Sequence, residues 1–358
     1  MSIKITNIFI LLSGLPPKKI CISCFYFLGT MPINFSRKHI KFLYSKDYFV
    51  FEKSDGVRGI LTWFRSKIYL LDRKLILNRI LKASVITNKN FLNIKTTLLD
   101  GELCFNLLIQ NYEYLIYDLI CLFGDWRIST WDMRGRLRAI SYVIKKSNFF
   151  FNKSLIKLKK KDIFKIFEIQ NLFFRIIQNK TSFERIYINC QIENNVICNK
   201  NDGLVFTPNK ISYISKSPFI TFKWKYENGN SIDFISNEST SLHKKKKLII
   251  KKLGIYLRMR NKIQFKFKNI KKINSRCFLS IYSFKETKCN IGEYLFNKKN
   301  SEWCFIKNRK DKNAANSFKI AINTLEISNE CFYKSEIIDN LYKISLRIRR
   351  GKDVKIYY

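Results

Sequence analysis

One lysine of this sequence stands where a turn could present it as a nucleophile. The segment Lys53-Ser54-Asp55-Gly56-Val57-Arg58 follows one short apolar run and precedes another. A lysine attacks phosphorus only as the neutral amine, and at an ordinary pKa of ~10.4 roughly one in 2,500 is neutral at pH 7. Cations such as Arg58, Lys223 and Lys225 would lower the pKa of Lys53 by like-charge repulsion and would also bind nucleotide phosphates. We therefore expect Lys53 to be a nucleophile with a depressed pKa, although a surface lysine beside a turn is the simpler interpretation of this segment alone.

Five further segments follow in an order that favours the first interpretation. They are Leu99-Asp100-Gly101-Glu102, Tyr114-Leu115-Ile116-Tyr117-Asp118, Asp202-Gly203-Leu204-Val205-Phe206-Thr207-Pro208, Lys223-Trp224-Lys225 and Ile232-Asp233-Phe234. Together with the lysine segment they resemble the covalent nucleotidyltransferase superfamily of capping enzymes and ATP-dependent polynucleotide ligases. Within that superfamily they look most like eukaryotic mRNA guanylyltransferases. The resemblance runs from about Pro32 to Asn316, which is most of the chain.

Several details are similar to the capping branch rather than to the ligases. The segment Pro32-Ile33-Asn34-Phe35-Ser36 resembles the family's PVS-type element, and Leu71-Asp72-Arg73 resembles its IDR element. The spacing from Lys225 to Asp233 is also similar to guanylyltransferases, since ligases usually end this motif in a compact lysine, acidic residue and tyrosine. The family's last motif is matched by Trp303, Lys307, Arg309, Asp311, Lys312 and Asn316. Position 307 is Lys where the family usually carries Arg, so the bidentate fork of a guanidinium is missing there.

The resemblance implies roles for the side chains that would hold the nucleoside. Glu102 would accept hydrogen bonds from ribose hydroxyls, Arg58 would contact ribose or phosphate, and Arg73 would belong to the same nucleotide-binding set. Tyr117, or its neighbour Tyr114, would stack on guanine, with Val205 or Leu204 on the other face of the base. These aromatic and aliphatic residues are equally compatible with a purely structural place in core strands. A turn carboxylate is the structural alternative for Glu102.

Other matched residues would hold phosphates, the metal and the guanine edge. Lys223 and Lys225 would hold the α-phosphate because a strand places residues two apart on one face, which turns Trp224 to the core. The resemblance implies that Arg309 and Lys312 reach the triphosphate in the first step.

Asp202 would help to hold Mg²⁺ or Mn²⁺, because phosphoryl transfer needs charge neutralisation and magnesium prefers oxygen ligands. An ordinary turn aspartate before glycine is the alternative at that position. In the family a lysine between the third and fourth motifs selects guanine, and Lys153 or Lys157 would match it.

The implied activity is transfer of GMP from GTP, through a covalent lysyl-GMP intermediate on Lys53, to the 5′ diphosphate end of nascent RNA. No phosphatase loop of the His-Cys-x5-Arg type occurs, so we expect a separate RNA 5′-triphosphatase as a partner. The resemblance also implies a possible contact with the phosphorylated tail of RNA polymerase II and a nuclear location. Two alternatives stay open: an ATP-dependent DNA or RNA ligase that forms lysyl-AMP, and a non-catalytic RNA-binding subunit of the same fold.

Composition limits the classes of protein to which this chain can belong. The chain has 358 residues, 46% of them hydrophobic, and a formal net charge of +40, which would attract a polyanion such as RNA. Lys, Ile, Asn, Phe and Tyr share A- and T-rich codons, so genomic bias is another source of this charge. The ten cysteines are scattered without the spacing of a disulfide framework, and the lone Cys21–Cys24 pair makes a zinc site improbable. No apolar run reaches the ~20 residues of a membrane span.

The elements that must position these residues indicate an α+β protein of two domains. We expect a nucleotidyltransferase domain of antiparallel sheets flanked by helices over residues 1–237 and an OB-fold β-barrel over 238–335. A helical tail over 336–358 would pack back on the first domain. Short apolar runs predict strands at 48–51, 59–64, 67–71, 98–105, 114–123, 204–206 and 219–225, and in the second domain within 248–267 and at 276–284 and 302–307. Apolar periodicity predicts helices at 36–43, 131–146, 162–177 and 336–348.

Overall fold

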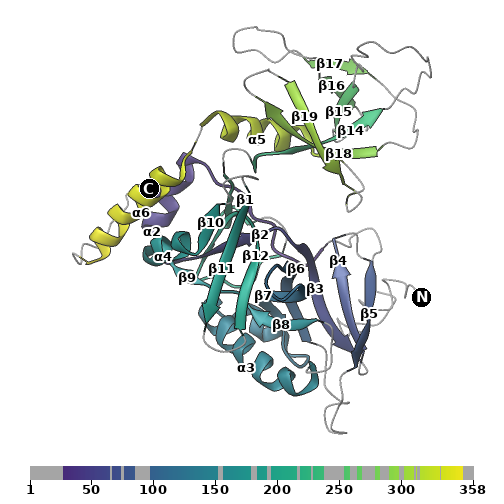
Figure 1. Cartoon of the computed structure of the whole chain (residues 1–358). Coiled ribbons are helices and arrows are strands. Elements are labelled where there is room, and N and C mark those ends of the chain that lie inside the picture. The colour runs from purple at the N-terminus through teal and green to yellow at the C-terminus, as the bar shows by residue number, and fades with distance from the viewer. Residues whose placement is uncertain are drawn as a thin grey trace. The chain divides into compact units, whose positions relative to one another are not determined.

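The chain divides into two compact units. The computed structural model describes residues 27–64, 67–73, 76–84, 97–151, 156–178, 184–191, 195–215, 218–226, 229–237, 254–258, 264–267, 279–282, 290–297, 302–309, 312, 315–330 and 332–349. Unit 1 comprises Met1–Trp224 and Tyr333–Tyr358, and unit 2 comprises Lys225–Phe332. Figure 1 labels most of the helices and strands of both units.

A six-stranded sheet forms the first half of unit 1. Its strand order is β5-β4-β3-β6-β7-β8, and every pairing is antiparallel except that of β8 with β7. The strands are β3 (Val57–Phe64), β4 (Lys67–Asp72), β5 (Leu77–Ser84), β6 (Thr97–Asn106), β7 (Asn111–Cys121) and β8 (Lys157–Lys160). This sheet contains the strands that the sequence predicted at 59–64, 67–71, 98–105 and 114–123.

A seven-stranded sheet forms the second half of unit 1 and carries the lysine segment. Its long strand β12 (Asn195–Pro208) pairs with β11 along one part of its length and with β2 and β13 along the other. The other strands are β1 (Ile33–Asn34), β2 (Tyr48–Ser54), β9 (Phe164–Lys165), β10 (Ile176–Gln178), β11 (Arg185–Gln191) and β13 (Phe222–Trp224). Lys53 therefore lies near the end of β2, with its backbone opposite Gly203 of β12.

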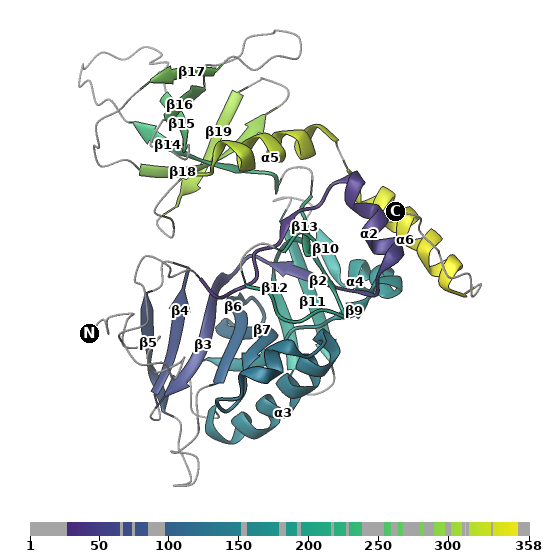
Figure 2. The ribbon, with the colours of Figure 1, turned by 180° about the vertical axis from the view of Figure 1, so that it is seen from behind.

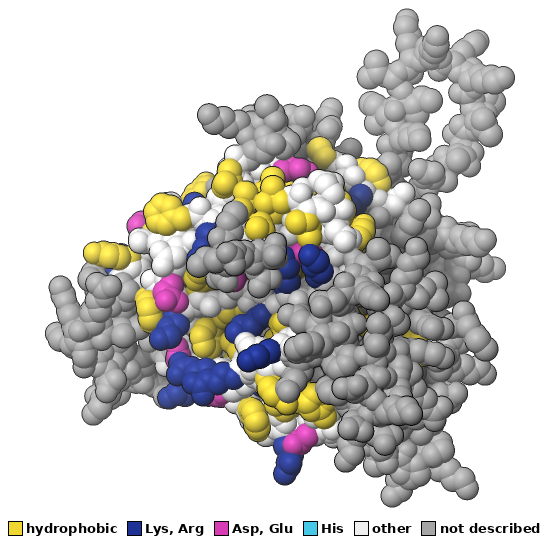
Figure 3. All heavy atoms as spheres, turned by 60° about the horizontal axis from the view of Figure 1, so that its bottom comes forward, with side chains coloured by type: hydrophobic (Ala, Val, Ile, Leu, Met, Phe, Trp, Pro, Cys, Tyr) yellow, Lys and Arg dark blue, Asp and Glu magenta, His cyan; other side chains and the backbone are white. Residues whose placement is uncertain are grey.

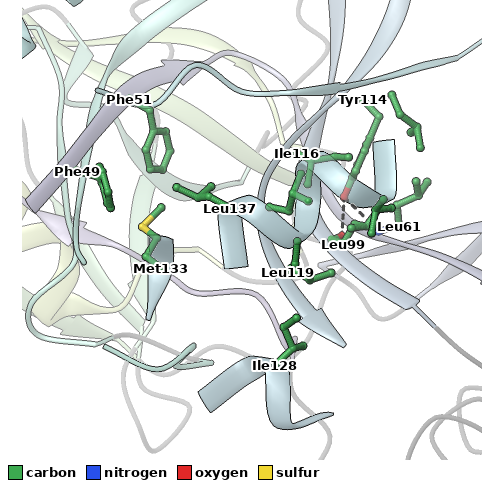
Figure 4. Close-up of a cluster of buried hydrophobic side chains, with 14 of the residues drawn as sticks. Phe49, Phe51, Leu61, Leu99, Tyr114, Ile116, Leu119, Ile128, Met133 and Leu137 are labelled. Atoms are coloured by element: carbon green, nitrogen blue, oxygen red, sulfur yellow. Dashed lines mark hydrogen bonds between the residues drawn. The ribbon is translucent and has the colours of Figure 1, made fainter. Parts of the chain in front are cut away.

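The main core of unit 1 lies where helix α3 (Met133–Phe151) packs on both sheets. Met133, Leu137 and Ile140 of α3 are buried, as their spacing of four and three residues predicted. They pack with side chains from β2, β3, β6 and β7 that Figure 4 draws as sticks. A smaller cluster on the other face of the six-stranded sheet contains Ile60 and Leu98. Because successive side chains of a strand point to opposite faces, the six-stranded sheet has buried apolar side chains on both faces.

Short helices surround this core, and the C-terminal helix packs on them. The short elements are η3 (Arg37–His39), α2 (Ile40–Ser45), η5 (Trp126–Thr130), η6 (Ile166–Glu168) and α4 (Ile169–Phe174). Helix α6 (Lys334–Arg349) lies beside α2 and α4 in both Figure 1 and Figure 2. A bidentate ion pair between Arg37 and Glu336, and the hydroxyl of Tyr44 on the Asn340 carbonyl, tie α6 to α2 and the turn before it.

Unit 2 is built on an antiparallel sheet of six strands in the order β17-β16-β15-β14-β18-β19. Its elements are β14 (Ile232–Asn237), β15 (Gly254–Arg258), β16 (Gln264–Phe267), β17 (Leu279–Tyr282), β18 (Asn290–Asn297), β19 (Glu302–Asn308) and α5 (Phe318–Glu330). The boundary lies at Lys225 instead of after residue 237, because β14 pairs with β15 and β18. The lysine-rich run that suggested the later boundary falls after β14.

Two helical elements differ from the sequence prediction. The helix expected over 162–177 is reduced to one turn of 3-10 helix and α4, because Phe164 and Lys165 pair with β2 and residues 176–178 pair with β11. Helix α5 lies where a barrel alone was expected. Among the described helices, none has both the length and the hydropathy needed to cross a bilayer.

Candidate active site

The ammonium of Lys53 is held by a carboxylate from the neighbouring strand. Lys53 Nζ lies 2.5 Å from Asp202 Oδ2, and the two side chains are 22% and 25% exposed. Both strands place these side chains at the point where β2 leaves the seven-stranded sheet for the turn at Asp55 and Gly56. The nucleophile candidate and the metal-ligand candidate of the sequence therefore meet directly.

A backbone irregularity aims Asp202 at the lysine. The pairing of β12 with β2 shifts register between Asn201 and Gly203, and Gly203 has a φ of 138°. Glycine adopts this conformation without the steric cost that a Cβ would bring. The Asn201 side chain fixes the bulge, because its amide donates to the Gly203 carbonyl at 2.9 Å and its oxygen accepts from the Gly203 N–H at 3.2 Å. The motif therefore uses Gly203 for its backbone conformation and Asp202 for its charge.

The electrostatic setting of Lys53 is the opposite of the one that the sequence suggested. Burial lowers the pKa of Lys53, but the negative charges of Asp202, Glu102 and Asp55 and the hydrogen bond to Asp202 raise it above its ordinary value. The predicted depression by neighbouring cations is therefore wrong for this arrangement. Lys53 is held as an ammonium, and it must lose a proton before it can attack phosphorus.

This arrangement makes the reactivity of Lys53 dependent on Asp202. In Asp202→Asn the largest of the effects that raise the pKa of Lys53 is removed, so we expect that pKa to fall and the neutral fraction at a given pH to rise. The measurement is the rate at which Lys53 is acylated by a small reagent as a function of pH, followed by mass spectrometry of the Lys53 peptide.

A matched control for this test is Glu184→Gln. It removes a carboxylate 2.6 Å from Lys200 in the same sheet and should leave the acylation profile of Lys53 unchanged. An unchanged or higher pKa of Lys53 in Asp202→Asn would show that Asp202 does not control this amine.

A second buried lysine, Lys161, contacts Ser54 and Glu102 and was not predicted as a site residue from the sequence. Its Nζ donates to Ser54 Oγ at 2.7 Å and lies 3.1 Å from Glu52 Oε1 and 3.6 Å from Glu102 Oε2. The side chain is 2% exposed. Although burial lowers its pKa, the carboxylates of Glu52 and Glu102 raise it, so Lys161 is a fixed buried cation. The Lys-Lys-Lys run at 159–161 carried no sequence signal that singled out its last member.

Of the two tyrosines proposed to stack on the base, Tyr117 contacts charged side chains of the candidate site. Its ring stacks on Phe51 at 5.6 Å and 18°, and the Arg58 and Lys161 cations lie 5.3 and 5.8 Å from its centroid. Tyr114 is fully buried, its hydroxyl 2.8 Å from the Gly59 and Leu99 carbonyl oxygens, and Figure 4 shows the contact with Leu99. The structural alternative therefore holds for Tyr114.

Val205 and Leu204 are buried as well. Val205 belongs to the main core with Phe51. The structure thus gives both residues the core position that was the alternative to base stacking.

Arg58 is engaged with protein groups, where the sequence suggested ribose or phosphate. Its Nε and Nη2 donate to the two Asp100 oxygens at 3.2 and 2.7 Å, and Nη1 donates to the Thr30 carbonyl oxygen. The Arg58 and Asp100 side chains are 5% and 0% exposed. The sequence predicted a guanidinium that binds ribose or phosphate. In the structure Arg58 is a buried cation that binds Asp100 next to Tyr117.

The paired lysines of the Lys-Trp-Lys segment fall in different units. Lys223 lies half-buried in β13, opposite Val205 of β12, and Trp224 is buried against Phe173, as its place between the lysines predicted. Lys225 begins unit 2, where its Nζ donates to the Gly229 carbonyl at 3.0 Å. The strand β13 ends at Trp224, so the two lysines do not share one strand face.

The cations of the last motif gather around acidic side chains inside unit 2. Arg309 Nη1 lies 3.0 Å from Asp233 Oδ1 and 3.4 Å from Glu293 Oε2, and Lys312 Nζ also pairs with Asp233. Asn316 accepts from the Asp233 N–H at 2.7 Å. The I-D-F motif and the last motif are therefore one ion-pair cluster.

The remaining site predictions lie at the edge of this arrangement or outside it. Arg73 is exposed in the turn after β4, and Lys157 is exposed in β8. Lys153, Asp311, Cys21 and Cys24 lie outside the described residues. Of the described lysines between the third and fourth motifs, Lys161 contacts Glu102 of the candidate site, whereas Lys157 is exposed.

The donor set at Lys53 suits a magnesium ion that keeps most of its water and phosphate ligands. Mg²⁺ at nucleotide sites is commonly held by one or two carboxylates, and Asp202 and Glu102 supply oxygen donors close to Lys53. Among the described residues, no group of three or more His, Cys, Asp or Glu side chains gathers to hold an ion by itself. The site therefore fits a metal that arrives with a nucleotide.

Comparison with known proteins places this site within a family. The model of the mRNA capping enzyme catalytic domain matches residues 18–227, which is more than half of the chain. The chain belongs to this family of capping enzyme catalytic domains. Lys53, Glu102, Tyr117, Lys161 and Asp202 all lie within the matched stretch. The resemblance to capping enzymes that was inferred from the ordered motifs is confirmed.

Individual capping enzymes are about a quarter identical to this chain over the aligned residues. An mRNA-capping enzyme subunit alpha of Schizosaccharomyces pombe is 28% identical over 225 residues, covering 58% of this chain and 53% of its own length. An mRNA-capping enzyme of Caenorhabditis elegans is 24% identical over 316 residues, covering 84% of this chain and 46% of its own length. The chain thus spans about half the length of the curated capping enzymes that it matches.

Among solved structures, the ATP-dependent DNA ligase of bacteriophage T7 in complex with ATP has a TM-score of 0.37. It is 16% identical to this chain and covers 64% of this chain and 77% of its own. A TM-score at that level reflects only a partial superposition. The family assignment of this capping-enzyme domain therefore depends on the sequence comparisons and the site.

Proposed function

We propose that the chain is a GTP:mRNA guanylyltransferase that forms a covalent lysyl-GMP intermediate on Lys53. The observation that carries the proposal is the position of Lys53 beside Asp202, Glu102 and Lys161 within a capping enzyme catalytic domain. A nucleophilic amine, acidic oxygen donors and a fixed cation are the groups that nucleotidyl transfer to lysine requires.

In the first step the neutral amine of Lys53 attacks the α-phosphorus of GTP. The N–P bond forms as the bond to the bridging oxygen of the β-phosphate breaks, and pyrophosphate leaves. The amine loses its proton before attack, and Asp202 is the carboxylate at 2.5 Å that receives it or passes it to water. In the second step a terminal oxygen of the RNA 5′ diphosphate attacks the same phosphorus, the N–P bond breaks, and Lys53 takes a proton back.

The chain's own residues orient the nucleoside for both steps. Tyr117, supported by Phe51 on its ring, stacks on guanine. Lys161, rather than Lys153 or Lys157, is the cation that meets the acceptor edge of the base, because it is buried beside Tyr117. Glu102 accepts from the ribose hydroxyls, and Lys223 holds the α-phosphate.

A divalent metal, Mg²⁺ or Mn²⁺, held by Asp202 with help from Glu102, would neutralise charge that develops on the phosphates. Arg309 and Lys312 of unit 2, whose sheet we propose to be an OB-fold barrel, serve the β- and γ-phosphates in the first step. Exchange of their partners Asp233 and Glu293 for phosphate is then part of nucleotide binding.

The proposed partners are RNA, a separate RNA 5′-triphosphatase and the phosphorylated tail of RNA polymerase II, in the nucleus. The formal charge of +40 supports RNA as a substrate, because a basic surface attracts a polyanion. Lys and Arg side chains form groups on the face that Figure 3 shows. The names of two of the related capping enzymes describe them as subunits, which is compatible with a partner that supplies another activity.

The test is incubation of the purified chain with magnesium and α-labelled GTP or ATP, followed by denaturation. We expect label on the chain with GTP and at least about tenfold less with ATP, since a site that pairs a buried cation with the base edge rejects the wrong edge. Release of the label as a cap on diphosphate-ended RNA completes the test. Preferential labelling by ATP would favour a ligase, and RNA binding without label from either nucleotide would favour a non-catalytic subunit.

A further inference from the structure

Tyr213 lies in the loop after β12, outside the motif segments from which the sequence predicted site residues. Its hydroxyl nevertheless donates to Asp100 Oδ2 at 2.5 Å. The Tyr213 hydroxyl oxygen also lies 3.2 Å from the Leu28 carbonyl oxygen and accepts from the Thr30 N–H at 3.1 Å. One phenol thus joins the six-stranded sheet of unit 1 to residues 28–30, which precede β1 of the seven-stranded sheet.

The carboxylate that Tyr213 meets is the partner of Arg58. Asp100 is fully buried and binds the guanidinium through both oxygens, so the hydroxyl and the cation share one carboxylate. Arg58 also donates to the Thr30 carbonyl, while Thr30 Oγ1 donates to the Ile214 carbonyl at 2.7 Å. Residues 28–30 are therefore fixed at Arg58 and at the Tyr213 loop together.

This network ends on the aromatic side chain at the proposed nucleotide site. The Arg58 guanidinium carbon lies 5.3 Å from the Tyr117 ring centroid, on a side chain that Phe51 stacks against. Because the cation–ring contact depends on where the guanidinium sits, a change in Asp100 alters the position of Tyr117. The influence of Tyr213 on this ring passes through Asp100, which its hydroxyl contacts, and through Arg58, which Asp100 binds.

We propose that Tyr213 is a positioning residue for nucleotide binding, acting through Asp100 and Arg58 on Tyr117. This inference rests on the proposed function of the Lys53 site. Burial and the Asp100 carboxylate hold the pKa of Tyr213 far above its ordinary value, so its hydroxyl remains a donor at physiological pH. The buried carboxylate depends on that donor, because a buried acceptor that loses a partner is not compensated by water.

The loop itself does not depend on the hydroxyl. The Tyr213 N–H donates to the Ser129 carbonyl at 2.7 Å, and the Arg136 cation lies 5.9 Å from the Tyr213 ring. Arg136 also donates to the Ile211 carbonyl at 2.9 Å. The variant Tyr213→Phe keeps all three contacts and should fold.

The experiment measures covalent nucleotide transfer to Lys53 in the full chain over a range of GTP concentrations. In Tyr213→Phe we expect KM for GTP to rise about tenfold while the maximal rate changes less than about twofold, since the lost interaction positions the bound nucleoside in ground and transition state alike. Tyr187→Phe is the matched control, because it removes a tyrosine hydroxyl from Asp162 at 2.7 Å in the same unit. Its KM should equal that of the wild type.

A double-mutant cycle tests the route. If Tyr213 acts through Arg58, then Tyr213→Phe changes KM less than about twofold in an Arg58→Lys background. Equal KM values for Tyr213→Phe and wild type, with a loss of thermal stability like that of Tyr187→Phe, would reduce Tyr213 to a structural residue and overturn the inference. A full tenfold effect in the Arg58→Lys background would overturn the route through Arg58. Absence of any adduct in the wild type would refute the proposed function, and the inference with it.

Discussion

Replacing Lys53 by alanine should abolish covalent nucleotide transfer, with a fall of more than about 10⁴-fold in adduct formation. The effect is large because the attacking atom itself is removed and the nearby buried amine is committed elsewhere. Lys161 donates to Ser54 and lies between Glu52 and Glu102, so it is not offered to a phosphorus. The measurement is label from α-labelled GTP that stays on the denatured chain.

A control variant separates loss of the nucleophile from loss of the fold. Lys200→Ala removes another lysine that is paired with a carboxylate, Glu184 at 2.6 Å, and should label like the wild type. The side chains of the Lys53 ion pair are 22% and 25% exposed, so its loss should cost less than the ~3–5 kcal/mol of a fully buried pair. Thermal unfolding of the two variants checks this. Label retained in folded Lys53→Ala would assign the intermediate to a different residue.

The features that the sequence predicted well are local ones. The strands on both sides of the lysine segment and the apolar face of α3 follow from alternation and periodicity within single segments. The tight turn at Asp55 and Gly56 likewise depends on neighbouring residues. Lys53 and Asp202 were found separately through their motifs, and the pairing of β2 with β12 explains why they meet.

The features that could not be predicted depend on tertiary contacts. Lys161 becomes a buried cation only because β8 pairs with β7 and delivers it to Glu52 and Glu102. In a chain with 67 Lys and Arg residues, nothing in its sequence neighbourhood distinguishes it. The pKa of Lys53 was expected to be depressed, because the sequence shows which cations are near in motif order and not which carboxylates are near in space.

The same reasoning explains the errors in helices and boundaries. The periodic segment 162–177 has apolar residues suited to a helix, but β9 and β10 are drawn into pairing with β2 and β11. The polar lysine run suggested a domain boundary, whereas the chain changes unit thirteen residues earlier, at Lys225, ahead of β14, which pairs in a different sheet. Long-range pairing outweighed local composition in each case.

The buried ion pair between Arg136 and Asp118 should be costly to break. Arg136 Nε and Nη2 donate to the two Asp118 oxygens at 2.7 and 3.1 Å, and these side chains are 1% and 9% exposed. Arg136 Nη1 donates to the carbonyl oxygens of Trp131 and Ile211 at 2.5 and 2.9 Å. Arg136→Met would leave two carbonyls and a carboxylate without these donors.

We expect Arg136→Met to lower the free energy of unfolding of unit 1 by about 3–5 kcal/mol, the range found when one partner of a buried pair is removed. Burial already raises the pKa of Asp118, and Arg136 counters that effect, so the variant should raise this pKa further and make Asp118 bind a proton on folding. The folded state then holds a proton that the unfolded state releases, so the deficit should shrink as pH falls through the raised pKa of Asp118 towards the ordinary pKa of the unfolded chain.

Urea unfolding at several pH values measures both effects. Arg127→Met is the matched control: its ion pair with Asp125 has a similar contact distance of 2.8 Å but is exposed, so its loss should cost much less. A second variant, Arg136→Met with Asp118→Leu, removes the orphaned carboxylate and should recover part of the loss. If Arg136→Met costs no more than Arg127→Met, the pair contributes nothing to the stability of unit 1. The loop that carries Tyr213 would then owe its position to other contacts.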